Sequence, residues 1–317
     1  MKILFIGNNA VLPDYLHDSV FHGLRELYGE TVVDANKLWY LYKDADLFNQ
    51  QNFENIRKPL HGWGYTYGGN LNNLNIDRTD IVQKIKNQYF DLLIFGICRG
   101  DPRNFEKAIY ERDDLLNKAL EIYPPKKLIF LDGSDSKEIK RPDLLNRGIY
   151  FKRENTGIGI PISFAIPKEK INFSHQKKKL IAEKNIPAHN RKNYKHATEA
   201  SYYSEYGESY FAITCKKGGY DCIRHYEIMS QGCLPLFADC ESMSKYTMSN
   251  SNIDFFMKCK SLIQFDFNIW TDGILKIHND KFDINIYESL RSEMYKNINR
   301  YTTESLCKYL IKKINEQ

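Results

Sequence analysis

The chain has 317 residues, of which 42% are hydrophobic and 27% are charged. This composition excludes an intrinsically disordered chain, and the length suits two domains of ordinary size. The net charge of +5 is too small to indicate a nucleic-acid partner by itself. It fits an enzyme that handles an anionic substrate or works near an acidic membrane surface.

The cysteines and the apolar runs indicate the compartment. The seven cysteines form an odd set with no CxxC pair and no zinc-ligand spacing, which argues against a disulfide framework and for a reducing environment. The N-terminal apolar run breaks at Gly7, so it predicts a first strand and not a signal peptide. No apolar run is long enough to cross a bilayer. We expect a cytoplasmic protein, with peripheral association at the inner face of the membrane as an open alternative.

Strands and helices alternate in the first part of the chain. Residues 2–6 predict a buried strand, and apolar residues then recur at helical spacing until Gly29. Residues 31–33 predict the next strand. A strand, helix and strand in this order predict a parallel sheet with a right-handed crossover.

The stretch 44–77 interrupts this order, because it holds many Asn, Gly and Tyr residues without a regular period. Such a stretch predicts a long loop or insertion. Regular patterns then return. They predict helices at 81–86 and 104–121, and strands at 91–96, 127–133, 148–152 and 160–166.

A shift in composition at about residue 165 predicts a domain boundary. The stretch 167–195 is charged and holds prolines, and we interpret its densest basic run, Lys177 to Lys179, as a solvated linker. Farther on, the pattern predicts helices at 198–208 and 221–231, strands at 210–214 and 234–237, and closing helices over 284–315.

The expected fold class is therefore α/β, with one domain over residues 1–165 and a second over residues 166–317. Ligands of open α/β sheets bind at the carboxyl ends of the strands. The cleft between two such domains is then the natural ligand site.

The most informative segment follows the predicted strand at 210–214. It is a basic loop with Lys216, Lys217, Gly218 and Gly219, and the helix after it carries Arg224 in its first turns. Glycines let the backbone approach a ligand closely, and a helix N-terminus offers free N–H groups and a positive dipole. This combination predicts an anion site that suits a diphosphate.

Arg224 and Glu227 are three residues apart, so they share one face of that helix. A surface salt bridge is the plain alternative. The functional interpretation rests on the preceding lysines and glycines, and on Gly232 and Pro235 beyond the helix, where they fit a C-terminal cap.

The pattern Arg224-x-x-Glu227-x-x-x-x-Gly232-x-x-Pro235-Leu236 resembles the donor-site helix of GT-B glycosyltransferases, including exostosin-like and bacterial polysaccharide enzymes. The DNA β-glucosyltransferase of T-even phages has a similar spacing of arginine and glutamate. The motif covers about two dozen residues of the chain, and the wider match is one of element order. The second domain is shorter than in that family by about one βα unit.

The resemblance implies two Rossmann-like domains that face a cleft, the first binding the acceptor and the second binding the nucleotide-sugar. It implies that Arg224 contacts the donor diphosphate and that Glu227 contacts the ribose hydroxyls. Many retaining members carry a second glutamate eight residues before this one, and that position is Gly219 here. The sequence therefore favours an inverting transfer.

An inverting transfer needs a general base and positive groups for the leaving diphosphate. The candidates for the base are Asp18 and Asp132, with His17 and His22 behind them, and Asp101 follows another predicted strand. A helix N-terminal cap is the alternative role for Asp18.

We expect no metal, because Asp132 and Asp135 are three residues apart and do not form a DxD motif. Lys152 and Arg153 lie near the predicted boundary and are candidates for further phosphate contacts, with a solvated strand edge as the alternative. The aromatic residues Trp63, Tyr65 and Tyr67 could stack on an acceptor sugar or pack within their own loop.

The sequence thus predicts an enzyme that transfers a sugar to a glycan or lipid-linked acceptor in surface polysaccharide biosynthesis, with no cofactor besides the nucleotide-sugar. Two alternatives remain open. One is a phage-type DNA base glucosyltransferase, against which the small net charge counts. The other is a nucleotide- or sugar-binding protein without catalysis. A dinucleotide enzyme is disfavoured, because the turn after the first strand lacks G-x-G-x-x-G.

Overall fold

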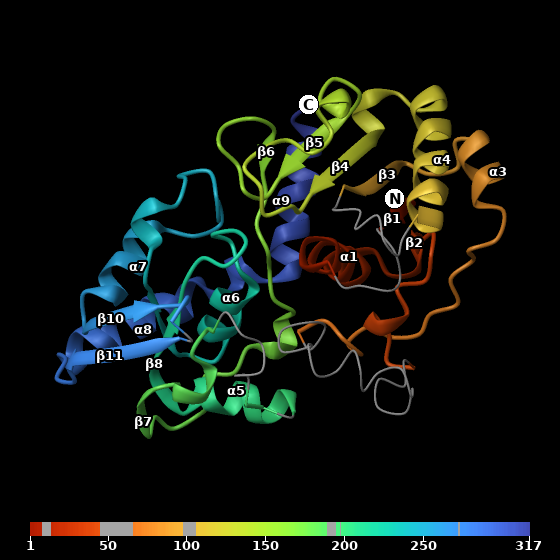
Figure 1. Ribbon diagram of the computed structural model, residues 1–317. Helices are drawn as coiled ribbons and strands as arrows, with labels where there is room; N and C mark the ends of the chain where they lie inside the picture. Colours follow the sequence, from red (N-terminus) through yellow and green to blue (C-terminus); the bar gives the residue numbers. More distant parts are fainter. Residues whose placement is uncertain (8–13, 45–65, 98–105, 189–194, 197, 272) are drawn as a thin grey trace.

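The computed structural model in Figure 1 describes residues 1–7, 14–44, 66–97, 106–188, 195–196, 198–271 and 273–317, with the backbone alone at 106–111. Within these residues the fold is mixed α/β. It contains a six-stranded parallel sheet, a three-stranded parallel sheet and an antiparallel hairpin. None of the helices in this described part is both long and apolar enough to cross a membrane.

The larger sheet is built by the first half of the chain and has the strand order β2-β1-β3-β4-β5-β6. The order reverses between β2 and β3 around β1, which creates a topological switch point where ligands of such sheets bind. Its strands are β1 (Ile3–Ile6), β2 (Val32–Asp34), β3 (Leu92–Ile97), β4 (Leu128–Asp132), β5 (Ile149–Lys152) and β6 (Ile160–Pro161).

Helices cover both faces of this sheet, which explains why its long strands are apolar without alternation. On β1, Ile3 and Phe5 pack in the core that also holds α1, whereas Leu4 and Ile6 pack in the core beneath α3 and α4. Figure 1 shows α3 and α4 on one side of the sheet and α1 with α9 on the other. The bounds are α1 (Tyr15–Tyr28), α3 (Ile81–Lys86) and α4 (Glu106–Ile122).

The second half of the chain forms the smaller sheet, β7-β8-β9, with its helices and a hairpin at its outer side. The strands are β7 (Lys179–Ile181), β8 (Ser209–Thr214), β9 (Leu234–Phe237), β10 (Gln264–Asn268) and β11 (Ile274–Asn279). The helices are α5 (Glu199–Gly207), α6 (Ile223–Ser230), α7 (Ile253–Lys260), α8 (Ile284–Asn297) and α9 (Thr303–Asn315).

The last helix, α9, returns to the first half and packs beside α1 (Figure 1). Gly23 makes this approach possible, because a Cβ there would lie 2.1 Å from the carbonyl oxygen of Thr303. The two segments that connect the halves, one at Ile166 and the other at residues 301–303, also pair with each other. The amide of Ile166 donates to the carbonyl of Tyr301 at 2.8 Å, and the amide of Thr303 donates to the carbonyl of Ile166 at 3.0 Å.

Most predicted elements are confirmed within one to three residues, but three regions differ. The strand predicted at 160–166 ends at Pro161, after which the chain crosses to the second half. The linker interpretation of Lys177 to Lys179 is wrong, because Lys179 begins β7 and the Lys177 ammonium donates to the carbonyl of Gly207. Burial lowers the pKa of Lys177 to about 8. The hairpin β10–β11 and helix α7 were not predicted.

Candidate functional site

The segment 215–222, here called the glycine loop, connects the carboxyl end of β8 to α6. His225 on α6 fixes both ends of this loop. Its Nε2 lies 2.8 Å from the carbonyl of Tyr220, and its Nδ1 lies 2.9 Å from the hydroxyl of Thr214. Burial lowers the pKa of His225 to about 3. The ring is therefore neutral, with Nε2 donating to Tyr220 and Nδ1 accepting from Thr214.

The two glycines of the loop lie against the first half of the chain. A Cβ at Gly218 would be 2.0 Å from Oδ2 of Asp135, and a Cβ at Gly219 would be 2.5 Å from Oε1 of Glu154. Asp135 and Glu154 follow the carboxyl ends of β4 and β5. The carboxyl ends of the two parallel sheets therefore face each other across the glycine loop, and a side chain at either glycine would have to displace these carboxylates.

Arg153 joins the two sheets at this contact. Its guanidinium is buried and donates to the carboxylates of Asp135 and Glu154 and to the backbone carbonyls of Gly133 and Asp221. A planar guanidinium with five donors suits this convergence of acceptors. Arg153 therefore lies beside the glycine loop. It was predicted as a phosphate contact, but its N–H donors are already bonded to acceptors of the protein.

Asp221, near the end of the glycine loop, lies in the same junction. Its Oδ2 accepts from the amide of Phe164 at 2.8 Å, and its Oδ1 accepts from the hydroxyl of Tyr226 at 2.9 Å. Burial raises the pKa of this carboxyl to about 7, although the positive charge of Arg153 opposes the shift. The helix was predicted to begin at residue 221, whereas α6 begins two residues later, at Ile223.

Arg224 and Glu227 both lie on α6, as predicted. Glu227 is only 1% exposed, so a surface salt bridge does not describe it. Its Oε1 accepts from the hydroxyl of Thr66 at 2.6 Å, and its Oε2 accepts from the hydroxyl of Tyr202 at 2.7 Å. Burial raises the pKa of the Glu227 carboxyl, and these two hydroxyls and Arg224 oppose the shift.

The charge of Arg224 reaches both ends of the glycine loop. Burial raises the pKa of Cys215 to about 12 and that of Cys222 to about 11, and in both cases Arg224 acts in the opposite direction. Lys217 is exposed on the same loop, and the ammonium of Lys216 lies 4.8 Å from the ring centroid of Tyr220. The glycine loop and the first turn of α6 thus carry three cationic side chains, those of Lys216, Lys217 and Arg224.

Asp18 and His17 lie on α1, in the first half of the chain. The cap role considered for Asp18 is wrong, because Asp14 caps α1 by accepting from the amides of Leu16 and His17. Asp18 is buried, and its Oδ1 accepts from the hydroxyl of Tyr40 at 2.5 Å. Its Oδ2 has no hydrogen-bond partner among the described residues. Burial raises the pKa of Asp18 well above its usual value.

His17 is also buried. Its Nε2 lies 3.5 Å from the carbonyl oxygen of Leu131, and its ring covers Gly96 on β3. A Cβ at Gly96 would be 2.1 Å from the ring, so the glycine makes room for this histidine. His22, five residues farther along α1, faces Thr303 and Glu169 instead. In the part of the chain that the structure describes, no hydrogen bond joins either histidine to the glycine loop.

Asp132 and Lys152 form a separate buried cluster at the carboxyl edge of the larger sheet. Asp132 accepts from the backbone and hydroxyl of Ser134, the amide of Lys140, the hydroxyl of Tyr150 and the ammonium of Lys152. Burial lowers the pKa of Lys152 while Asp132 opposes the shift. Both side chains form hydrogen bonds with each other and with their neighbours, which favours a role in stabilising the fold.

Tyr67 lies between the two halves of the molecule. Its hydroxyl donates to the carbonyl of Ala165 and lies 2.7 Å from the hydroxyl of Ser19. Burial raises the pKa of Tyr67, and the carboxylates of Asp18 and Glu227 raise it further. Tyr67 is therefore packed at this junction. The other two aromatic candidates, at 63 and 65, and Asp101 lie outside the described residues.

Sequence reasoning missed Thr66 and Tyr202, the partners of Glu227. Tyr202 and Tyr206 are four apart on α5 with their hydroxyls 3.0 Å apart, a spacing that marks one helix face. Thr66 had no such pattern, since it lies in the predicted loop.

No known protein-family model matches the chain, and no curated protein matches its sequence. In the part of the chain that the structure describes, no group of three or more His, Cys, Asp or Glu residues is arranged to hold a metal ion.

Proposed function

We propose that the protein is a glycosyltransferase that moves a sugar from a nucleotide-sugar to a glycan or glycolipid acceptor, with two Rossmann-like domains in the GT-B arrangement. The observation that carries the proposal is the glycine loop. It lies where the carboxyl ends of two parallel sheets face each other, and it leads into the helix with Arg224 and Glu227. Ligands of parallel sheets bind at such edges.

In the proposed donor site, Arg224, Lys216 and Lys217 attract the diphosphate, and the N-terminus of α6 adds its dipole. Glu227 takes the ribose. Its two present hydrogen-bond donors are neutral hydroxyls, from Thr66 and Tyr202. A ribose hydroxyl is the same kind of donor. We therefore propose that it replaces the Thr66 hydroxyl on Oε1 when the donor binds.

The general base of the proposed inverting transfer is Asp18. Because burial raises its pKa, its carboxylate is a stronger base than an exposed aspartate. Oδ2 of Asp18 has no hydrogen-bond partner in the described part of the chain, so it can accept a proton from an acceptor hydroxyl. Asp132 is the weaker candidate, since five donors already use its two oxygens.

The positive groups at the glycine loop would hold the charge that develops on the leaving diphosphate. The surface-polysaccharide role rests on the resemblance of the α6 motif alone. The two alternatives predict different results: a DNA base glucosyltransferase would transfer the sugar to DNA, and a binding-only protein would bind the nucleotide-sugar without turnover.

The test is calorimetric titration of UDP, GDP, CMP and their sugars into the wild type and Arg224→Ala, without divalent metal. We expect one nucleotide to bind the wild type and to bind Arg224→Ala roughly tenfold to a hundredfold more weakly, because a charge-assisted contact is lost. Arg147→Ala is the matched control, because this exposed arginine donates to no described group besides the carbonyl of Leu120.

A folded wild type that binds no nucleotide, or an Arg224→Ala variant with unchanged affinity, would overturn the donor site. Turnover separates an enzyme from a binding protein. Asp18→Asn should keep its nucleotide affinity and lose transfer by about two to four orders of magnitude.

A further inference from the structure

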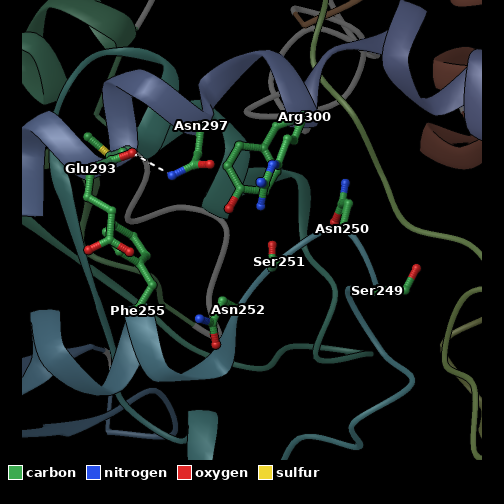
Figure 2. Close-up of a pocket in the computed structure, with 10 residues that line it drawn as sticks. Ser249, Asn250, Ser251, Asn252, Phe255, Glu293, Asn297 and Arg300 are labelled. Carbon is green, nitrogen blue, oxygen red and sulfur yellow. Dashed lines mark hydrogen bonds between the residues drawn. The ribbon is translucent and has the colours of Figure 1, made fainter.

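A polar pocket lies beside the second connection between the halves, outside the proposed donor site. Its volume is about 180 Å³. One wall is the loop of residues 249–252 that leads into α7, and the other is the end of α8 with the short helix η9 (Ile298–Tyr301). Figure 2 shows Glu293, Asn297 and Arg300 on one wall and Ser251 and Asn252 on the other.

The pocket combines uncharged hydrogen-bonding groups with one acid and one base. Its polar lining is Ser249, Asn250, Ser251, Asn252, Asn297, Glu293 and Arg300. No hydrogen bond or ion pair within the described part of the chain uses the side-chain charge of Glu293 or Arg300. Among the described residues, the Asn297 amide donates to the backbone carbonyl of Glu293 at 2.8 Å, and its amide oxygen is left to accept a hydrogen bond.

The apolar part of the lining is formed by Phe255, Met294 and Tyr301, all of them buried. They contribute the smaller, apolar share of the lining, against which a C–H face of a ligand can pack. A ligand for this pocket therefore has one face with C–H groups and a periphery of groups that both donate and accept hydrogen bonds.

We infer that this pocket binds one neutral sugar ring of a glycan. Hydroxyl groups both donate and accept, which matches the amides and hydroxyls of the lining. The carboxylate of Glu293 can accept from two neighbouring hydroxyls, and the guanidinium of Arg300 can donate to two. The volume suits one hexose-sized ring.

The two charges also bear on which ligand class fits. An anion is attracted by Arg300 but repelled by Glu293, and a cation the reverse, so neither gains a large net electrostatic attraction in this pocket. A neutral polyhydroxylated ring satisfies both groups at once. The charge pair therefore favours a neutral saccharide over a phosphate, a nucleotide or an amine.

The pocket is a separate site and not a part of the donor site. None of its lining residues belongs to the glycine loop or to α6. It is linked to both connections between the halves, because the Asn250 amide donates to the carbonyl of Phe164 at 3.3 Å and the carbonyl of Tyr301 accepts from Ile166. A bound sugar would anchor a glycan chain beside the junction, which goes beyond the proposed transfer reaction.

The test is a glycan microarray probed with the full chain. The neutral oligosaccharides on it end in hexoses, N-acetylhexosamines or deoxyhexoses, and glycans with uronic acids or phosphosugars represent charged ligands. Ligand-observed NMR then gives the dissociation constant of the best glycan. We expect a neutral glycan to bind, and its affinity to fall roughly tenfold in each of Glu293→Gln, Asn297→Ala and Arg300→Ala.

Lys296→Ala is the matched control, because it removes one positive charge from the exposed neighbouring position that does not line the pocket. The control and Arg224→Ala should keep wild-type glycan affinity. The inference would be overturned if the folded wild type bound no neutral glycan or only charged glycans. It would also be overturned if the three pocket variants bound the glycan as tightly as the wild type does. Loss of binding in Arg224→Ala would overturn it as well, since the glycan would then occupy the donor site.

Discussion

Two buried carboxylates, Asp132 at the end of β4 and Glu227 on α6, differ in what surrounds them. Asp132 takes five donors, among them the ammonium of Lys152 at 3.1 Å. Glu227 takes the hydroxyls of Thr66 and Tyr202. The first network is closed around a buried ion pair, whereas the second uses neutral donors that a ligand hydroxyl can replace. Burial alone therefore does not distinguish a structural acid from a binding acid, but the kind of donor does.

The largest expected effect comes from breaking the closed network. Asp132→Ala leaves the fully buried ammonium of Lys152 without its carboxylate. Removing one partner of a buried pair costs about 3–5 kcal/mol in the free energy of unfolding, which urea unfolding measures. Asp143→Ala, which breaks an exposed pair with Arg141, should cost less than about 1 kcal/mol. Equal losses in the two variants would contradict the structural assignment of Asp132.

The second prediction uses Asp221, whose pKa is raised to about 7. An acid with a raised folded-state pKa stabilises the fold at low pH, and this contribution is lost as pH rises from the unfolded value near 4 to the folded value near 7. Asp221→Asn removes the titrating carboxyl and with it this loss of stability at higher pH. Its stability relative to the wild type should therefore rise between pH 4 and 8 by on the order of 2–4 kcal/mol.

The measurement for Asp221 is the urea midpoint as a function of pH for both proteins. Asp254→Asn, at an exposed position, should follow the wild type at every pH. A constant difference between Asp221→Asn and the wild type over this range would mean that Asp221 is charged in the folded protein throughout.

Elements with strong local patterns could be predicted from the sequence. Helix α6, the loop before it and the glycine cap after it are all encoded within some twenty residues, and Gly232 does adopt a positive φ of 63°. Hairpin β10–β11 was missed, although its strands alternate exposed and partly buried residues as half-buried strands do. Strand β7 was missed because its lysines suggested a linker.

The environment of the candidate site could not be predicted, because its contacts join distant parts of the chain. Thr66 is 161 residues from Glu227, and Arg153 is 68 residues from Asp221. The glycines were predicted to let the backbone approach a ligand, and in the structure the groups that lie against them are the carboxylates of Asp135 and Glu154. Spacing along one helix predicts which residues share a face, and only the tertiary fold decides what that face meets.

Glu227→Gln tests the exchangeable network directly. Glutamine can still accept from one hydroxyl, and it removes a carboxyl whose ionisation burial disfavours. The free energy of unfolding should change by less than about 1 kcal/mol, in contrast to Asp132→Ala. Nucleotide affinity should fall roughly tenfold, because a charge-assisted hydrogen bond to the ribose becomes a neutral one. Calorimetry and urea unfolding on the same samples measure both. A large loss of stability with unchanged affinity would assign Glu227 to the fold.

The smallest expected effect comes from Thr66→Val, and its direction is the informative part. The variant removes the hydroxyl from Oε1 of Glu227, so the ligand-free protein should lose about 1 kcal/mol of stability. If a ribose hydroxyl takes the same oxygen, the nucleotide no longer displaces an internal donor, and its affinity should rise about threefold. Thr31→Val, which removes an exposed hydroxyl bound to the carbonyl of Tyr28, should leave affinity unchanged. Weaker nucleotide binding by Thr66→Val would instead mean that Thr66 contacts the bound donor, and the exchange on Glu227 would be wrong.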